Sequence, residues 1–86
     1  MKLVFSQIAW EDYIFWQKED KKILRKINDL IKSIQTNPYE GIGKPEPLKY
    51  DLAGLWSRRI DLEHRLVYKV EGDNLYIYSC RYHYDK

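Results

Sequence analysis

A stripe of apolar residues at intervals of three and four is the feature that most constrains the fold of this chain. Its members, between positions 20 and 36, are Ile23, Leu24, Ile27, Leu30, Ile31 and Ile34. This spacing predicts an amphipathic helix that begins after Asp20 as its N-cap and ends at Asn37 and Pro38. Such a helix has to bury its apolar face, so the rest of the chain must supply a surface for it.

The segments on either side of this helix differ in period. Residues 3–5 predict a short strand, and Ser6 is placed to cap a first helix whose apolar side chains recur at helical spacing: Ala9, Trp10, Tyr13, Ile14 and Trp16. Residues 39–47 contain two glycines and two prolines and predict a loop. Beyond it the period falls to two, which predicts strands over 48–52, 56–62, 64–70 and 75–82, with a hairpin turn at 72–74.

These elements predict an α+β fold in the order β-α-α-β-β-β-β. Two N-terminal helices pack on a twisted, mainly antiparallel sheet, and the second half forms an antiparallel meander. The last strand is ambiguous, because Leu75 and Ile77 compete with Tyr76, Tyr78 and Cys80 for the core, and a bulge would exchange the two sets. With 86 residues, 44% of them hydrophobic, we expect one folded domain spanning 1–86.

Composition also bears on location and partners. Cys80 is the only cysteine, which favours a reducing compartment, and no apolar run approaches the length of a membrane span. We therefore expect a cytoplasmic protein without a membrane partner. The 15 Lys and Arg residues against 13 Asp and Glu residues give a net charge of only +2, so the position of the charges matters more than their sum.

Cations concentrate in the second half of the chain, which makes a polyanion a plausible partner. They are Lys44, Lys49, Arg58, Arg59, Arg65 and Arg81. A second basic surface is the outer face of the long helix, which is either a solvated exterior or faces RNA, and both interpretations stay open. Its charged residues are Lys22, Arg25, Lys26, Asp29 and Lys32.

Strand alternation predicts a candidate acid-base site. If Leu66 and Tyr68 face the helices, Arg65 faces away, and the same rule applied to the preceding strands turns Lys49 and Arg59 to that open face. If His83 joins this face, an imidazole lies among cations, and the loop with Glu46 ends just before Lys49. A proton donor among cations is suited to phosphodiester chemistry.

Each of these residues also has a simpler interpretation. His83, near the C-terminus, fits an ordinary surface residue, and Glu46, between two prolines, fits an exposed loop residue. Arg65 fits equally well as a structural ion-pair partner of Glu63 or Asp61. His64, beside a predicted turn, is expected to be polar surface.

Several motifs in order resemble the YoeB/Txe toxins of the RelE-like superfamily of bacterial toxin-antitoxin systems. They are the run 41–48 (Gly-Ile-Gly-Lys-Pro-Glu-Pro-Leu), the run 54–60 around Trp56 and Arg59, the run 63–68 around Arg65, and the terminal Cys80, Arg81, Tyr82, His83 and Tyr84. The similarity extends over essentially the whole chain. Two departures stand out: Asp85 and Lys86 extend past the Tyr84 at which such chains commonly end, and Tyr50 stands where a His is frequent.

The resemblance implies a ribosome-dependent mRNA endoribonuclease, an mRNA interferase, that cuts messenger in the ribosomal A site. It implies Glu46 as general base, His83 as general acid and Arg65 as the group that stabilises the phosphate, with Lys49, Arg59 and Tyr84 binding and orienting the RNA. It implies no metal and no cofactor, since acid-base catalysis with the ribose 2′-OH as nucleophile needs neither.

The partners implied are the ribosome, mRNA and a cognate antitoxin similar to YefM or Axe, and a homodimer is left open. A function of another class also stays open: a non-catalytic RNA-binding or co-repressor module that acts with an antitoxin. The joint presence of Glu46, Arg65 and His83 favours the enzyme.

Overall fold

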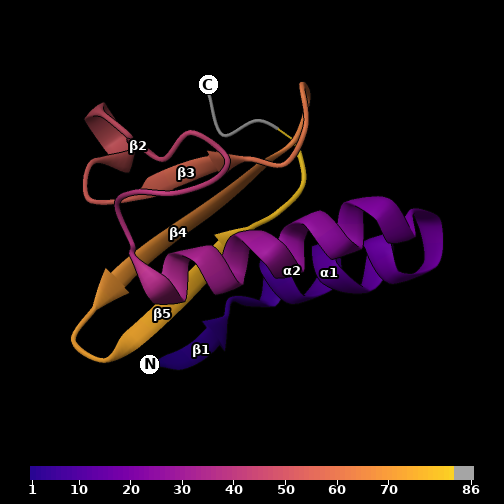
Figure 1. Ribbon diagram of the computed structural model, residues 1–86, viewed down its shortest axis with the longest axis horizontal. Helices are drawn as coiled ribbons and strands as arrows, with labels where there is room; N and C mark the ends of the chain where they lie inside the picture. The colour runs from indigo at the N-terminus through magenta and orange to yellow at the C-terminus, as the bar shows by residue number, and fades with distance from the viewer. Residues whose placement is uncertain (83–86) are drawn as a thin grey trace.

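The computed structural model describes residues 1–82 as two helices packed on a five-stranded sheet (Figure 1). The elements in chain order are β1 (Lys2–Phe5), α1 (Gln7–Glu19), α2 (Lys21–Thr36), β2 (Glu46–Pro47), the 3₁₀ turn η1 (Tyr50–Leu52), β3 (Trp56–Arg59), β4 (Arg65–Glu71) and β5 (Asn74–Ser79). This arrangement confirms the predicted α+β fold.

The sheet has the strand order β1-β5-β4-β3-β2. Strands β2 to β5 pair antiparallel with their neighbours, as a meander does, and β1 adds parallel to β5. Strands β1 and β2 therefore form the two opposite edges of the sheet (Figure 1). The prediction of a mainly antiparallel sheet is confirmed.

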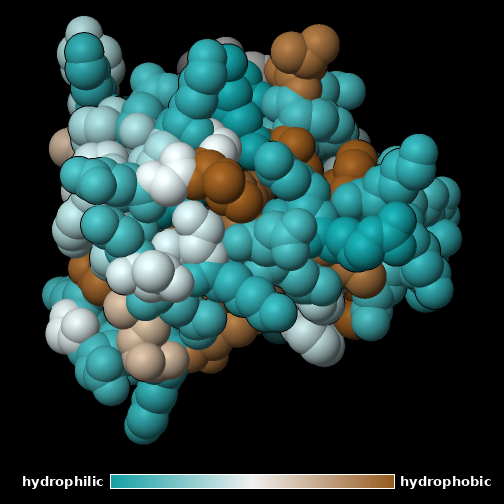
Figure 2. All heavy atoms as spheres, in the orientation of Figure 1, coloured by the Kyte–Doolittle hydropathy of each residue, from teal (hydrophilic) through white to brown (hydrophobic). Residues whose placement is uncertain are grey.

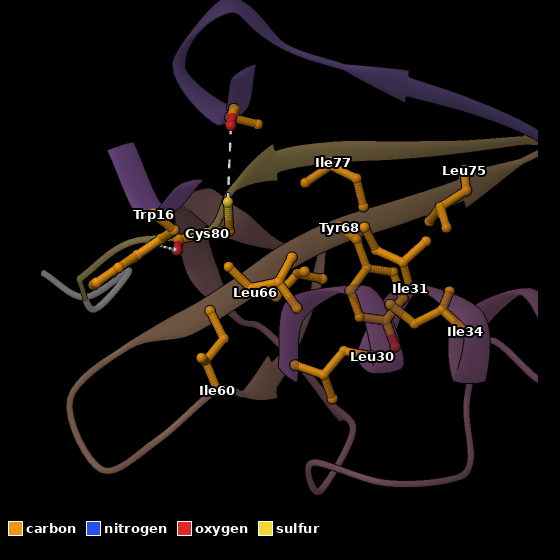
Figure 3. Packing of buried hydrophobic residues seen from close by; sticks show 12 residues of the cluster. Trp16, Leu30, Ile31, Ile34, Ile60, Leu66, Tyr68, Leu75, Ile77 and Cys80 are labelled. Carbon is orange, nitrogen blue, oxygen red and sulfur yellow. Dashed lines mark hydrogen bonds between the residues drawn. The ribbon is translucent and has the colours of Figure 1, made fainter. Parts of the chain in front are cut away.

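Both helices begin at the predicted caps. The side chain of Ser6 accepts a hydrogen bond from the backbone N of Ala9, and Asp20 accepts bonds from the first turn of α2. The apolar stripe of α2 faces the sheet, where it packs against β4 and β5 (Figure 3). The fully buried side chains of this layer are Ile27, Leu30, Ile34, Leu66, Tyr68, Leu75 and Ile77.

A bulge near the end of β5 settles which of its residues are buried. Tyr68 pairs with Ile77, whereas the preceding Val67 pairs with Ser79, so Tyr78 is an extra residue in the ladder. The extra residue reverses the alternation, so that Leu75, Ile77 and Cys80 are all fully buried.

The strand predicted over 48–52 is wrong. Pairing with β3 is confined to Glu46 and Pro47, and residues 50–52 form the 3₁₀ turn η1 instead. Tyr50 has a left-handed backbone (φ 57°) and is 91% exposed, so only Leu48 of the predicted inward residues is buried. Apolar residues two apart fit a tight turn as well as a strand. Here the segment closes into a turn, and the backbone N of Leu48 donates a hydrogen bond to the carbonyl oxygen of Leu55.

The outer face of α2 is hydrophilic (Figure 2). Lys22, Arg25, Asp29 and Lys32 are exposed there, as the amphipathic pattern predicts. Within residues 1–82, no helix combines the length and the apolar character needed to cross a membrane.

Candidate active site

The β3–β4 hairpin brings two arginines together. Arg59 and Arg65 are direct partners in the ladder, on the face of the sheet that is opposite the helices, since their neighbours Leu66 and Tyr68 belong to the core. Arg59 is exposed and Arg65 is half-buried. Two guanidinium groups side by side attract an anion more strongly than either alone.

The guanidinium of Arg65 is held by the turn that precedes it. Its Nη1 donates to the carbonyl oxygens of Asp61 (2.9 Å), His64 (3.1 Å) and Leu62 (3.4 Å). The ion pair considered from the sequence does not form, because Asp61 accepts hydrogen bonds from the backbone of Glu63 and His64, and the Glu63 carboxylate lies 3.7 Å from His64 Nε2. Neither the Asp61 nor the Glu63 carboxylate therefore neutralises the charge of Arg65.

Glu46 shares this face of the sheet. It pairs with Ser57, which is two residues before Arg59, so the alternation of β3 puts Glu46, Arg59 and Arg65 on one side. Glu46 is exposed, and so is Lys49, which precedes η1 outside the ladder. This face therefore offers a ligand the carboxylate of Glu46, the exposed cation of Arg59 and the cation of Arg65, which the preceding turn holds in place.

The loop that leads to Glu46 is fastened to the end of α2 by Arg58, a residue that the sequence placed with the surface cations. Arg58 is fully buried: its guanidinium donates to Ser33 Oγ and to the carbonyl oxygens of Asn37 (2.7 Å), Glu40 (3.0 Å) and Ile42 (3.1 Å), and its Nε donates to the hydroxyl of Tyr68. The cation also lies at the negative end of the helix dipole of α2. Arg58 is thus a structural residue.

Two glycines allow the loop to pass this closely. A Cβ at Gly41 would overlap Ser33 Oγ, and one at Gly43 would lie 2.6 Å from Leu30 Cδ2. Gly43 has φ 82°, and its carbonyl oxygen accepts a bond from the backbone N of Arg59. The glycines thus connect the loop directly to β3, beside the candidate site.

Residues 80–82, here called the C-terminal segment, are held by α1 and β4. The indole Nε1 of Trp16 donates to the carbonyl oxygen of Cys80 at 2.8 Å (Figure 3), and the Asp12 carboxylate accepts a bond from the backbone N of Cys80. The backbone N of Tyr82 donates to His64 Nδ1, and the carbonyl oxygen of Tyr82 accepts from the backbone N of Arg65. The segment is thereby fixed next to Arg65.

Comparison with known proteins identifies the family. Residues 5–84 match the model of the YoeB-like toxin of bacterial type II toxin-antitoxin systems. The chain belongs to this YoeB-like toxin family. It is 60% identical to Toxin YoeB of Escherichia coli K12 over 84 residues, which is 98% of this chain and 100% of that toxin.

Solved structures agree with the assignment to the YoeB-like family. The YoeB/ParE toxin from Agrobacterium tumefaciens has a TM-score of 0.95 at 53% identity, covering 98% of this chain and 100% of that one. Toxin from the heterotetrameric YoeB-YefM toxin-antitoxin complex of Staphylococcus aureus has a TM-score of 0.90 at 54% identity, with 98% of both chains covered. The fold and the toxin family are therefore established.

For this YoeB-like toxin, the six residues expected at the site divide into three groups. Glu46, Arg59 and Arg65 share one sheet face by strand register. Lys49 is exposed outside the ladder. His83 and Tyr84 lie outside the described residues.

Sequence reasoning misjudged His64, which is buried and not polar surface. Only 8% of it is exposed, and its ring packs edge-on against Trp16 with centroids 4.8 Å apart. Its place beside a turn concealed this, because the turn at 61–63 bends the chain back and sends the His64 side chain beneath α1 and the C-terminal segment. The only available signal was its position within the family motif around Arg65.

Burial shifts the pKa of two ionisable groups: Asp12, which contacts the C-terminal segment, and Cys80, which belongs to it. Desolvation raises the pKa of Asp12, although the hydrogen bond from Cys80 opposes that rise. Burial raises the pKa of the Cys80 thiol to about 12, so the thiol is un-ionised at neutral pH and is a poor nucleophile. In the part of the chain that the structure describes, no three His, Cys, Asp or Glu side chains gather in a way that could hold a metal ion.

Proposed function

We propose that this YoeB-like toxin is a ribosome-dependent endoribonuclease that cleaves mRNA in the ribosomal A site in the cytoplasm. The observation that carries the proposal is the shared sheet face of Glu46, Arg59 and Arg65, with Tyr82 hydrogen-bonded to the backbone of Arg65. Tyr82 directly precedes His83. The proposal assigns the base to Glu46, the phosphate-binding cation to Arg65 and the acid to His83.

The reaction is an attack of the RNA on itself. Glu46 removes the proton of a ribose 2′-OH, the oxygen attacks the adjacent phosphorus, and Arg65 stabilises the charge that develops on the phosphoryl oxygens. His83 donates a proton to the departing 5′-oxygen. The products are a 2′,3′-cyclic phosphate and a 5′-hydroxyl, and none of these reaction steps requires a metal ion.

The remaining candidate residues bind the substrate. Lys49 and Arg59 are exposed cations that would contact flanking phosphates, and Tyr84 would orient the RNA. An exposed carboxylate and exposed cations hold a flexible strand only loosely, whereas alignment of a nucleophile with its phosphate strongly accelerates such reactions. We assign that alignment to the ribosome, which fixes the mRNA in its A site.

The same cations supply a basis for inhibition. The S. aureus relative is named in complex with the antitoxin YefM. We propose that an antitoxin similar to YefM neutralises this chain by laying acidic side chains over Lys49, Arg59 and Arg65, which blocks access of the RNA phosphate.

The test is to incubate the purified protein with ribosomes that carry a defined mRNA and to analyse the ends of the products. We expect cleavage in the A-site codon that leaves a 2′,3′-cyclic phosphate and a 5′-hydroxyl. A 2′-deoxy nucleotide at the scissile position removes the nucleophile and should abolish cleavage. Intact mRNA despite binding to the ribosome would favour the RNA-binding module, and cleavage of the deoxy substrate would exclude the 2′-OH mechanism.

A further inference from the structure

The backbone of Tyr82 leaves the sheet before the candidate acid His83. Strand β5 ends at Ser79, and Tyr82 has a left-handed backbone with φ 66°. A non-glycine residue in that region is strained and persists only where its surroundings fix it. Tyr82 therefore requires contacts outside the β5 ladder.

Two consecutive residues supply these contacts. The Nδ1 atom of His64 accepts a hydrogen bond from the backbone N of Tyr82 at 2.7 Å, and the backbone N of Arg65 donates to the carbonyl oxygen of Tyr82 at 3.1 Å. Both backbone groups of Tyr82 are thus satisfied, one by Arg65 at the start of β4 and the other by His64, the residue before it. The Arg65 bond comes from the main chain, so the His64 bond is the one that a side-chain substitution can remove.

The imidazole of His64 is itself held in one orientation. Its ring packs on Trp16, and the backbone N of the residue donates to the Asp61 carboxylate at 2.6 Å. Because Nδ1 accepts a hydrogen bond through its lone pair, it carries no proton, and the ring proton resides on Nε2. Nε2 lies 3.7 Å from the Glu63 carboxylate, which favours a proton at that nitrogen.

We propose that His64, in its Nε2–H tautomer, is a positioning residue that fixes the backbone of Tyr82 beside Arg65, and that the candidate acid His83, the next residue in the sequence, depends on this contact for its activity. His64 is too deeply buried to act on the RNA itself. Its role rests on the proposed function, since it works through His83. Misplacement of a reacting group by about 1 Å can cost on the order of 10²-fold in rate.

Two substitutions separate the acceptor of His64 from its ring. His64→Asn places an amide oxygen at the position of Nδ1 and keeps the acceptor, while His64→Phe keeps a ring against Trp16 and removes the acceptor. We expect His64→Phe to lower single-turnover cleavage on ribosomes by about 10-fold or more, and His64→Asn to restore most of the parental rate. Thermal melts should show both proteins folded.

A measurement without RNA tests the contact separately from the catalytic role. Hydrogen exchange at the Tyr82 amide should be slow in the parental protein and in His64→Asn, and at least about 10-fold faster in His64→Phe, because only that variant leaves the amide without its acceptor. If the parental protein cleaves no mRNA, the proposed function fails, whereas the exchange result still decides whether His64 fixes Tyr82.

Three results would overturn the inference. One is parental exchange and parental cleavage in His64→Phe. Another is equal loss of both properties in the two variants, which would show that the hydrogen-bond acceptor at Nδ1 does not account for the effect. The third needs no variant: imidazole ¹⁵N chemical shifts of the parental protein should place the proton on Nε2, and a proton on Nδ1 contradicts the proposal even if a variant fails to fold.

Discussion

At the scale of single residues, the most consequential side chain outside the proposed site is Arg58. Among residues 1–82, no carboxylate is a hydrogen-bond partner of this fully buried guanidinium, which is unusual because burial of a charge is costly unless polar groups surround it. Here the carbonyl oxygens of the loop after α2 surround it. Arg58 stabilises the loop, and the loop leads to Glu46.

We predict that Arg58→Ala lowers the free energy of unfolding by about 3 kcal/mol or more, because it leaves several buried carbonyl oxygens without a donor. Arg58→Lys keeps the charge but has fewer hydrogen-bond donors in a different geometry, so its free energy of unfolding should lie between those of the parent and Arg58→Ala. Urea denaturation measures both. The matched control is Arg25→Ala on the exposed face of α2, which should change stability by no more than about 0.5 kcal/mol. Equal stability of Arg58→Ala and Arg25→Ala would contradict the assigned role.

At the scale of elements, α1 controls where the chain goes after β5. Asp12 accepts the backbone N of Cys80, Trp16 donates to its carbonyl oxygen, and the guanidinium of Arg81 stacks on Phe15 at 3.5 Å from the ring centroid. The first helix thus holds the C-terminal segment although it contributes no residue to the proposed chemistry. A substitution that breaks one of these contacts should affect the proposed site, although it removes none of the residues of that site.

The raised pKa of Asp12 gives this contact a defined dependence on pH. A carboxyl whose pKa is higher in the folded state than its unfolded value of 3.8 makes the folded state bind more protons, so its contribution to stability is present at low pH and is lost as pH rises through the folded pKa. Asp12→Asn keeps an oxygen acceptor for Cys80 but does not titrate. We predict that the stability of Asp12→Asn relative to the parent increases as pH rises above 3.8 and then levels off. Denaturation curves from pH 3 to pH 7 test this, and a relative stability that falls over this range contradicts it.

Elements with a strong local signal could be predicted from the sequence, and those decided by tertiary contacts could not. The caps Ser6 and Asp20, the stripe on α2 and the shared face of Arg59 and Arg65 follow from spacing alone. The turn η1 was mistaken for a strand because a period of two over five residues does not separate the two structures. Arg58 and His64 were misplaced because a charged residue and a residue beside a turn are usually exposed.

At the scale of the whole molecule, the proposed site is assembled from segments that are distant in the chain. Glu46 comes from the edge strand β2, Arg65 from the central strand β4, and the segment before His83 is held by α1 and His64. The sheet is therefore the scaffold, and the helices stabilise it and direct the C-terminal segment. Loss of activity can then arise from the site itself or from the scaffold, and the two causes must be separated.

The most direct test of the account is single-turnover cleavage of ribosome-bound mRNA by Glu46→Gln, Arg65→Ala and His83→Gln. Each should lower the rate by at least ~10²-fold, because each removes a group that acts on the reacting atoms, while thermal melts remain close to the parent. Arg25→Ala, which also removes one arginine charge, should cleave at the parental rate. If all three site variants cleave within a few-fold of the parent, the proposed active site is wrong.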